Sequence, residues 1–148
     1  MSEVFDNPTP WVAAHIRRYV ESGGARGHRF NGHDALLLTT RGRRTGRLRR
    51  TALYYGRDED RYVLVATPLR TGDDPAWYRN LTANPAVVVQ VRADTFAAVA
   101  RSASEGDRPR LWQLMLGVFA KYAQYEREAG RSLPVVVVQP RDSQAGLM

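Results

Sequence analysis

The sequence predicts a mainly β protein with helices (α+β), built on a largely antiparallel, barrel-like sheet of six strands. Six strand-length apolar segments occur, and short turns join four of them in pairs, as in β-hairpins. Neither the alternation of strands and helices typical of a parallel sheet nor the motifs G-x-G-x-x-G and G-x-x-x-x-G-K-[ST] occur, which excludes the ordinary dinucleotide-binding and P-loop folds. The length of 148 residues fits one domain spanning residues 1–148.

The six predicted strands are apolar segments bounded by turn residues. They are Ala35–Thr40, Leu48–Tyr55, Arg61–Thr67, Ala86–Arg92, Thr95–Ser102 and Leu133–Gln139. Arg41–Gly46 is the predicted turn of one hairpin, and Ala93-Asp94 is that of the other. We therefore expect the barrel to span about residues 35–140, with residues 141–148 as a frayed tail.

Three helices are predicted from apolar periodicity and end signals. The first runs from Trp11 to Glu21, or about residues 10–22 with its ends, with Thr9 as N-cap and Pro10 at the first helical position. A short helix, Ala76–Thr82, follows Asp74 as N-cap. One long helix is expected from the capping box at Ser104–Asp107 to about Arg127, before a stop at Gly130.

Composition limits the classes of function. Cysteine is absent, which excludes disulfides and thiolate chemistry and fits a reducing cytoplasm. The three histidines have no zinc-ligand spacing, so no metal site is expected. No apolar segment is long enough to span a bilayer, and no secretory signal is present. The net charge of +7 predicts an anionic partner, which could be nucleic acid, anionic lipid or a phosphorylated ligand.

The densest motif is Arg41-Gly-Arg-Arg-Thr-Gly-Arg-Leu-Arg-Arg50, with six arginines in ten residues. It is either a solvated hairpin tip or a cradle for an acidic ligand. In the second case, backbone N–H groups of the turn would form an anion-binding nest beside the Arg43 and Arg44 side chains. A contact with a nucleic-acid backbone stays open from the charge alone.

Two further features carry aromatic residues. Asp74–Pro85 reads by itself as a capped helix with Trp77 and Leu81 facing the core. Phe119, Tyr122 and Tyr125 are spaced by three along the long helix and would pack in the core or form the wall of a ligand site. Core packing is the more common role of such a stripe, but the two tyrosine hydroxyl groups complicate this reading, because buried hydroxyls need partners.

Together, and in this order, these features resemble the deazaflavin (F420)-dependent nitroreductase family of actinobacteria. The resemblance covers nearly the whole chain and is strongest from Ala35 to Pro85. It is carried by the segments Leu36–Gly46, Ala52–Gly56, Val63–Ala66, Pro75–Pro85 and Leu133–Pro140, with Asn7-Pro-Thr-Pro-Trp11 before them. The resemblance implies a split β-barrel like that of flavin mononucleotide-binding proteins, and use of reduced coenzyme F420.

The resemblance also implies roles for particular residues. The phosphate and glutamate tail of F420 would be held by the arginine turn, through Arg43, Arg44, Thr45 and Arg49. Ala66 and Trp77 would line the cofactor pocket, and Thr67 matches a hydroxyl near the deazaflavin ring. Phe119, Tyr122 and Tyr125 match an aromatic trio that contacts the substrate. Thr67, Tyr122 and Tyr125 are then the candidate catalytic residues.

The chain departs from the family pattern in two places. Pro68-Leu69-Arg70 replaces a basic residue followed by glycines, so Arg70 becomes the candidate for the missing charge on the cofactor tail. Phe119 lacks the hydroxyl of the nitroimidazole-reducing members. The expected reaction is therefore hydride transfer from F420H2 to an electron-poor acceptor, such as a quinone, an enone or a nitroaromatic, with quinones preferred to nitroimidazoles.

Alternatives of other classes remain at this point. The chain could be a non-catalytic F420- or FMN-binding protein, or a nucleic-acid-binding module, although residues 41–50 lack the aromatic residues that stack on bases. The helix from Trp11 to Glu21 is expected to cap the substrate pocket or to touch anionic membrane, and simple docking on the barrel is the equal alternative. In the membrane case its stripe of Trp11, Ile16 and Tyr19 would face lipid, at the inner membrane face.

Overall fold

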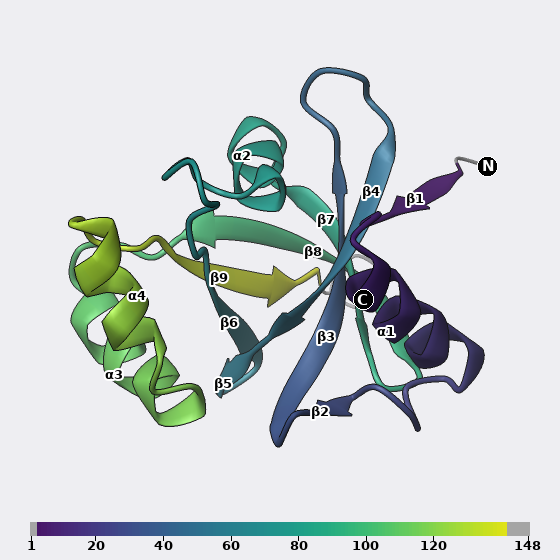
Figure 1. Ribbon diagram of the computed structural model, residues 1–148, viewed down its shortest axis with the longest axis horizontal. Coiled ribbons are helices and arrows are strands. Elements are labelled where there is room, and N and C mark those ends of the chain that lie inside the picture. Colours follow the sequence, from purple (N-terminus) through teal and green to yellow (C-terminus); the bar gives the residue numbers. More distant parts are fainter. Residues whose placement is uncertain (1–2, 142–148) are drawn as a thin grey trace, which may run out of the picture.

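The computed structural model describes residues 3–141, in which four helices surround nine strands (Figure 1). The strands are β1 (Val4–Asp6), β2 (Arg29–Phe30), β3 (His33–Arg41), β4 (Leu48–Tyr54), β5 (Gly56–Asp58), β6 (Arg61–Val65), β7 (Ala86–Val91), β8 (Asp94–Ser102) and β9 (Val135–Pro140). The helices are α1 (Pro10–Glu21), α2 (Ala76–Ala83), α3 (Arg108–Val118) and α4 (Tyr122–Ala129). The predicted tail, apart from Arg141, lies outside the described residues.

The mainly antiparallel sheet is confirmed, but the predicted count of six strands is wrong. The six expected strands are β3, β4 and β6 to β9, and both predicted hairpins form. The three additional strands, β1, β2 and β5, have only two or three residues each. β2 was detectable, because Asn31-Gly32 is a favoured two-residue hairpin turn and joins β2 to β3.

The strands follow the order β1-β4-β3-β7-β8-β9-β6-β5, and no pairing closes the two ends within residues 3–141. β1 covers β4 only at Leu48–Arg50, and β5 covers β6 only at residues 61–63. The outer edges of β4 at residues 51–54 and of β6 at residues 64–65 therefore lack a strand partner. We call the space between these two edges the seam.

Both faces of the central strands are buried, which explains their unbroken apolar sequences. One face of β3, β6 and β9 contributes Leu36, Leu64 and Val136 to the largest core cluster. Residues one position away on the same strands face outwards into two other clusters. Leu37 packs beneath α1, whereas Val63 and Val135 pack beneath α3 and α4.

The predicted long helix is wrong in two respects. α3 begins at Arg108, with Asp107 and not Ser104 at the N-cap, and it ends at Val118, before α4 begins at Tyr122. Phe119 has an extended backbone, with φ −149° and ψ 100°. Its ring packs among Tyr54, His33 and Tyr122, with centroid distances of 5.2, 5.1 and 5.0 Å. The apolar spacing continues across the break, so periodicity could not reveal it.

The predicted helix ends agree only in part with the structure. Thr9 occupies the N-cap of α1 and Gly130 follows α4, as predicted, but the Thr9 side chain makes no capping hydrogen bond. Asp74 is not the N-cap of α2, because Pro75 takes that position. The Asp74 carboxylate instead pairs with Arg131 at 2.9 Å, which fixes the loop before α2.

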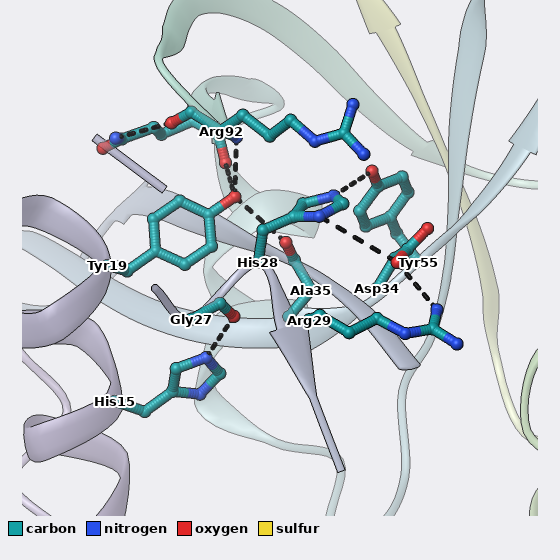
Figure 2. A network of polar contacts seen from close by, with 10 residues as sticks. His15, Tyr19, Gly27, His28, Arg29, Asp34, Ala35, Tyr55 and Arg92 are labelled. Atoms are coloured by element: carbon teal, nitrogen blue, oxygen red, sulfur yellow. Dashed lines mark hydrogen bonds and ion pairs between the residues drawn. The ribbon is translucent and has the colours of Figure 1, made fainter. Parts of the chain in front are cut away.

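Helix α1 is anchored on the sheet by a buried polar network (Figure 2). The Tyr19 hydroxyl donates to the Ala35 carbonyl at 3.0 Å and accepts from the Arg92 backbone N–H at 2.8 Å. Nearby, Nε2 of His28 lies 2.8 Å from the Tyr55 hydroxyl. Burial lowers the pKa of His28 and raises the pKa of Tyr55 to about 12, so this pair is held as two neutral groups.

This docking overturns the membrane-facing stripe predicted for α1. Ile16 and Tyr19 are completely buried against the sheet, so they cannot face lipid. Trp11 alone of the three is exposed, at 63%. No helix among residues 3–141 is long and apolar enough to cross a membrane.

The turn after α1 gives a stability prediction. Gly24 has φ +83°, and a Cβ there would lie 2.3 Å from the backbone Cα of Arg92. Gly24→Ala should therefore destabilise the protein both by strain and by overpacking. Gly32→Ala is the matched control, because Gly32 has φ +82° and no neighbouring atom within 4 Å.

Chemical denaturation of both variants measures the difference. Strain at positive φ costs about 1–2 kcal/mol in either variant. Overpacking should cost Gly24→Ala about 1–3 kcal/mol more. Equal unfolding free energies would mean that a Cβ at position 24 does not clash with the Arg92 backbone.

Candidate functional site

Two cavities lie along strand β4, and their linings differ in chemistry. The larger, about 420 Å³, is lined by four arginines, and we call it the arginine cavity. The smaller, about 200 Å³, is lined mainly by aromatic and aliphatic side chains, and we call it the aromatic cavity. Thr51 of β4 lines the first and Ala52 to Tyr54 line the second.

The arginine cavity is built around the tip of the β3–β4 hairpin. Its lining comprises Phe5, Asp6, Asn7, Pro8, Thr9, Thr40, Gly42, Arg43, Arg44, Thr45, Arg49, Arg50, Thr51, Leu69, Pro75, Ala76, Trp77 and Asn80. The tip stands at one end of the sheet, beside α2 and β1 (Figure 1). Segments from three parts of the sequence therefore enclose the arginines.

The predicted backbone nest is largely absent from the arginine turn. The N–H groups of Gly42 and Gly46 bond to carbonyls of the turn itself, at 2.7 and 2.8 Å. The N–H of Arg47 bonds to Thr45 Oγ1 at 3.1 Å, and that of Arg43 bonds to Asn80 Oδ1 at 3.2 Å. Since these donors are used, the side chains must provide most of the contacts to an anion.

Asn80 of α2 fixes Arg43, and the sequence reading gave Asn80 no role. Its side chain is only 3% exposed. Its Oδ1 accepts from both the backbone N–H and Nη1 of Arg43, and its Nδ2 donates to Thr40 Oγ1 at 3.1 Å. Its position one helical turn after Trp77 placed it on the same helix face, which was the available signal.

The charges in the arginine cavity repel one another. Desolvation, followed by the neighbouring Arg79 and Arg44 guanidinium groups, lowers the pKa of Arg43. No ion pair involves Arg43, Arg44 or Arg49 anywhere in residues 3–141. An anion in this cavity would relieve that repulsion and form charge-assisted hydrogen bonds.

Strand β1 forms the other wall, and the sequence reading missed it altogether. The guanidinium groups of Arg47 and Arg49 lie over the Phe5 ring, 5.2 and 5.9 Å from its centroid. Asp6 pairs with Arg50 at 2.6 Å. Arg50 is therefore neutralised within the protein, whereas Arg49 is positioned with its charge free for a ligand.

The aromatic cavity occupies the seam between β4 and β6. Its lining comprises Trp11, His15, Phe30, Asn31, Ala35, Ala52, Leu53, Tyr54, Val65, Thr67, Phe119, Tyr122 and Tyr125. On one side, His15 stacks on Phe30 with centroids 4.0 Å apart, and Phe30 stacks on Trp11 at 6.1 Å. On the other side, Phe119 contacts Tyr54, Tyr122 and Tyr125. The cavity thus has two aromatic walls, of which the sequence predicted one.

Tyr122 differs from an ordinary core tyrosine. It is 5% exposed, and burial, followed by Tyr54 and Tyr125, raises its pKa. Its hydroxyl makes no hydrogen bond with any group of residues 3–141, and it belongs to the lining of the aromatic cavity. It can therefore donate a hydrogen bond to a molecule bound there.

The cavities separate the sequence-predicted residues into two groups. Arg43, Arg44, Thr45, Arg49 and Trp77 line the arginine cavity. Thr67, Phe119, Tyr122 and Tyr125 line the aromatic cavity.

Two predicted cofactor-binding residues line neither cavity. Ala66 is fully buried, and Arg70 is exposed on the loop after β6. Leu69, next to Arg70, reaches the arginine cavity instead. The departure of Pro68-Leu69-Arg70 from the family pattern therefore puts an apolar side chain at the cavity wall.

Comparisons with known proteins agree on one family. The family model for F420H(2)-dependent quinone reductase matches residues 11–140. A Mycobacterium tuberculosis protein named F420H(2)-dependent quinone reductase is 37% identical over 131 residues, which cover 86% of this chain and 88% of that protein.

Solved structures are similar to this chain as well. One described as an F420-H2 dependent reductase is 31% identical with a TM-score of 0.63, covering 71% of this chain and 93% of its own. Another, described as a domain-swapped dimer, is 29% identical with a TM-score of 0.67. The match covers 90% of this chain and 100% of that one. The resemblance in the sequence motifs is thereby confirmed, and the chain belongs to the F420H(2)-dependent quinone reductase family.

Proposed function

We propose that this protein reduces a quinone with F420H2, holding the coenzyme tail in the arginine cavity and the acceptor in the aromatic cavity. The observation that carries the proposal is the pairing of these two cavities along β4. One presents three arginines without ion-pair partners in residues 3–141, and the other is lined by uncharged, largely aromatic groups. An acidic tail and a flat, apolar acceptor match these two linings.

The donor set of the arginine cavity fits the coenzyme. A phosphodiester and carboxylates are anions that guanidinium groups bind through two parallel hydrogen bonds. Arg43, Arg44 and Arg49 would hold this tail with Thr45, and Trp77 would provide an apolar wall beside it. When bound, F420H2 supplies a hydride from C5 of the deazaflavin ring.

The residues of the aromatic cavity would bind and orient the acceptor. A planar quinone would pack between the wall of Trp11 and Phe30 and the wall of Phe119 and Tyr125. The Tyr122 hydroxyl, with Tyr125 and Thr67, would hydrogen-bond a carbonyl oxygen. Enones and nitroaromatics share these features, but Phe119 offers a nitroimidazole no hydroxyl, so quinones should react faster.

Helix α1 would cap the acceptor site. Trp11 and His15 line the aromatic cavity, whereas the other predicted membrane-facing residues are buried. Within residues 3–141, neither Ala66 nor Arg70 lines one of the two cavities. A role of either residue in coenzyme binding therefore stays a prediction.

The direct test is oxidation of F420H2 by menadione, followed through the absorbance of the oxidised coenzyme. We expect catalysed oxidation with F420H2 and little with reduced flavin mononucleotide. A rate no faster than the uncatalysed reaction, together with tight F420 binding, would favour a non-catalytic carrier. Equal or tighter binding of flavin mononucleotide would reject the coenzyme assignment.

The arginine turn gives a quantitative prediction. Arg43→Ala with Arg44→Ala should weaken F420 binding about tenfold or more, because each charge-assisted contact contributes about 1.5–3 kcal/mol. Fluorescence titration of F420 measures the affinity. Arg17→Ala with Arg18→Ala is the matched control, because it removes the same charge from α1, where both side chains are exposed. Equal losses in the two double variants would indicate general electrostatic attraction only.

The Tyr122 hydroxyl gives a second prediction. Tyr122→Phe should lower kcat/KM for menadione about three- to tenfold, because one neutral hydrogen bond contributes about 0.5–1.5 kcal/mol. F420 affinity should stay unchanged. Tyr78→Phe is the control, since the Tyr78 hydroxyl bonds to Ser102 and Tyr78 lines neither cavity. Loss of F420 affinity in Tyr122→Phe would place α4 in the coenzyme site instead.

A further inference from the structure

The aromatic cavity has one imidazole in its lining, that of His15 of α1. The other ionisable groups in its lining are Tyr54, Tyr122 and Tyr125, and no Asp, Glu, Lys or Arg is among them. Histidine is the residue whose ordinary protonation change falls between about pH 5 and 8. The sequence reading assigned His15 only to the apolar stripe of α1.

The geometry divides the two nitrogens of His15 between two roles (Figure 2). Nε2 lies 2.7 Å from the carbonyl oxygen of Gly27, so Nε2 carries a hydrogen and donates it there. The imidazole ring is 2% exposed and stacks on Phe30, with an interplanar angle of 12°. The ring is therefore held in one orientation and one tautomer.

Nδ1 is left free by this arrangement. It makes no hydrogen bond with residues 3–141, yet no buried side-chain nitrogen or oxygen in that part of the chain lacks a partner. Nδ1 must therefore reach open space, and His15 lines the aromatic cavity. A histidine with one nitrogen fixed by a carbonyl and the other facing a ligand is arranged for proton transfer.

Reduction of a carbonyl acceptor requires such a group. Addition of a hydride to the acceptor forms an oxyanion, and one proton must then bond to that oxygen to give the neutral product. We propose that protonated His15 donates this proton from Nδ1 and regains it from water. The inference rests on the proposed reduction of an acceptor in the aromatic cavity.

The tyrosines of the cavity are poorer proton donors. Burial raises the pKa of Tyr122, so its hydroxyl stays protonated and orients the acceptor without releasing a proton. The ionisable groups to consider beside His15 are Tyr19 on its own helix, with ring centroids 6.3 Å apart, and the tyrosines that line the same cavity, which are Tyr54 of β4 and Tyr122 and Tyr125 of α4. None of them is a carboxylate, so an anionic acceptor would be the counter-ion of protonated His15.

The first test uses the coenzyme-free protein and 2-hydroxy-1,4-naphthoquinone, a stable anion that resembles the reduced acceptor. Calorimetry in buffers of different ionisation enthalpy counts the protons taken up on binding. At about pH 7.5, above the ordinary pKa of histidine near 6.5, we expect uptake of up to one proton. The affinity should fall as the pH rises further, because protonation then becomes less favourable. Binding of the anion without proton uptake by the wild-type protein would overturn the proposal.

The matched variant is His15→Gln, because the glutamine amide can donate to Gly27 as Nε2 does but cannot titrate. It should melt near the wild-type temperature, bind F420 normally, take up no proton and bind the anion about tenfold more weakly. A structural role alone would leave proton uptake unchanged. Should His15→Gln not fold, the wild-type calorimetry still decides the question.

Kinetics separate this inference from the proposed function. With saturating F420H2, His15→Gln should lose about tenfold or more in kcat, as expected when a general acid is removed, with little change in KM. The loss should be larger for an enone than for a quinone, because an enolate is more basic than a hydroquinone anion. Wild-type kcat should fall with rising pH, and that dependence should disappear in His15→Gln.

Each outcome has one meaning. If the wild type and His15→Gln reduce the quinone with the same rate and pH dependence, His15 is not the proton donor and the proposed function stays intact. No reduction by the wild type would reject the proposed function and, with it, the role of His15 in that reaction.

Discussion

Tyr55 is the only residue between strands β4 and β5, although these strands lie near opposite ends of the hydrogen-bonded order of the sheet. This connection forces the sheet to coil until its ends meet. They meet without pairing, because β1 and β5 cover only parts of the edges of β4 and β6. The Tyr55 side chain is itself held by His28, at 2.8 Å. The seam, and with it the aromatic cavity, follows from this constraint.

Helices close the seam from both sides and supply its chemistry. α1 contributes Trp11 and His15, and the break between α3 and α4 turns Phe119 and Tyr122 towards β4. Because the central strands are apolar on both faces, they can bind these helices on the outside and still fill the inner core. The site therefore depends on helix docking as much as on the sheet, and the Tyr19 bonds to Ala35 and Arg92 fix the position of His15.

Charge is confined to one end of the site. The arginines gather at the hairpin tip, where Asn80 holds Arg43, Phe5 lies beneath Arg49, and Asp6 neutralises Arg50. Along β4 the lining then changes within one residue, from Thr51 to Ala52, to a cavity with no Asp, Glu, Lys or Arg in its lining. In the proposed function, this division matches a coenzyme with an acidic tail that reacts with an apolar acceptor, because the arginines would lie away from the acceptor.

The sequence by itself determined the six longer strands and helices α1 and α2, because hairpins and amphipathic helices follow from local turn residues and periodicity. It also determined the arginine turn and the trio of Phe119, Tyr122 and Tyr125, which lie close together along the chain. Only the tertiary structure decided which distant residues join them. Phe5, Asp6 and Asn80 complete the arginine cavity, and Trp11, His15 and Phe30 complete the aromatic one. Short strands such as β1 have too few residues for a pattern, and the role of a buried polar side chain is set by its partner, which local sequence does not specify.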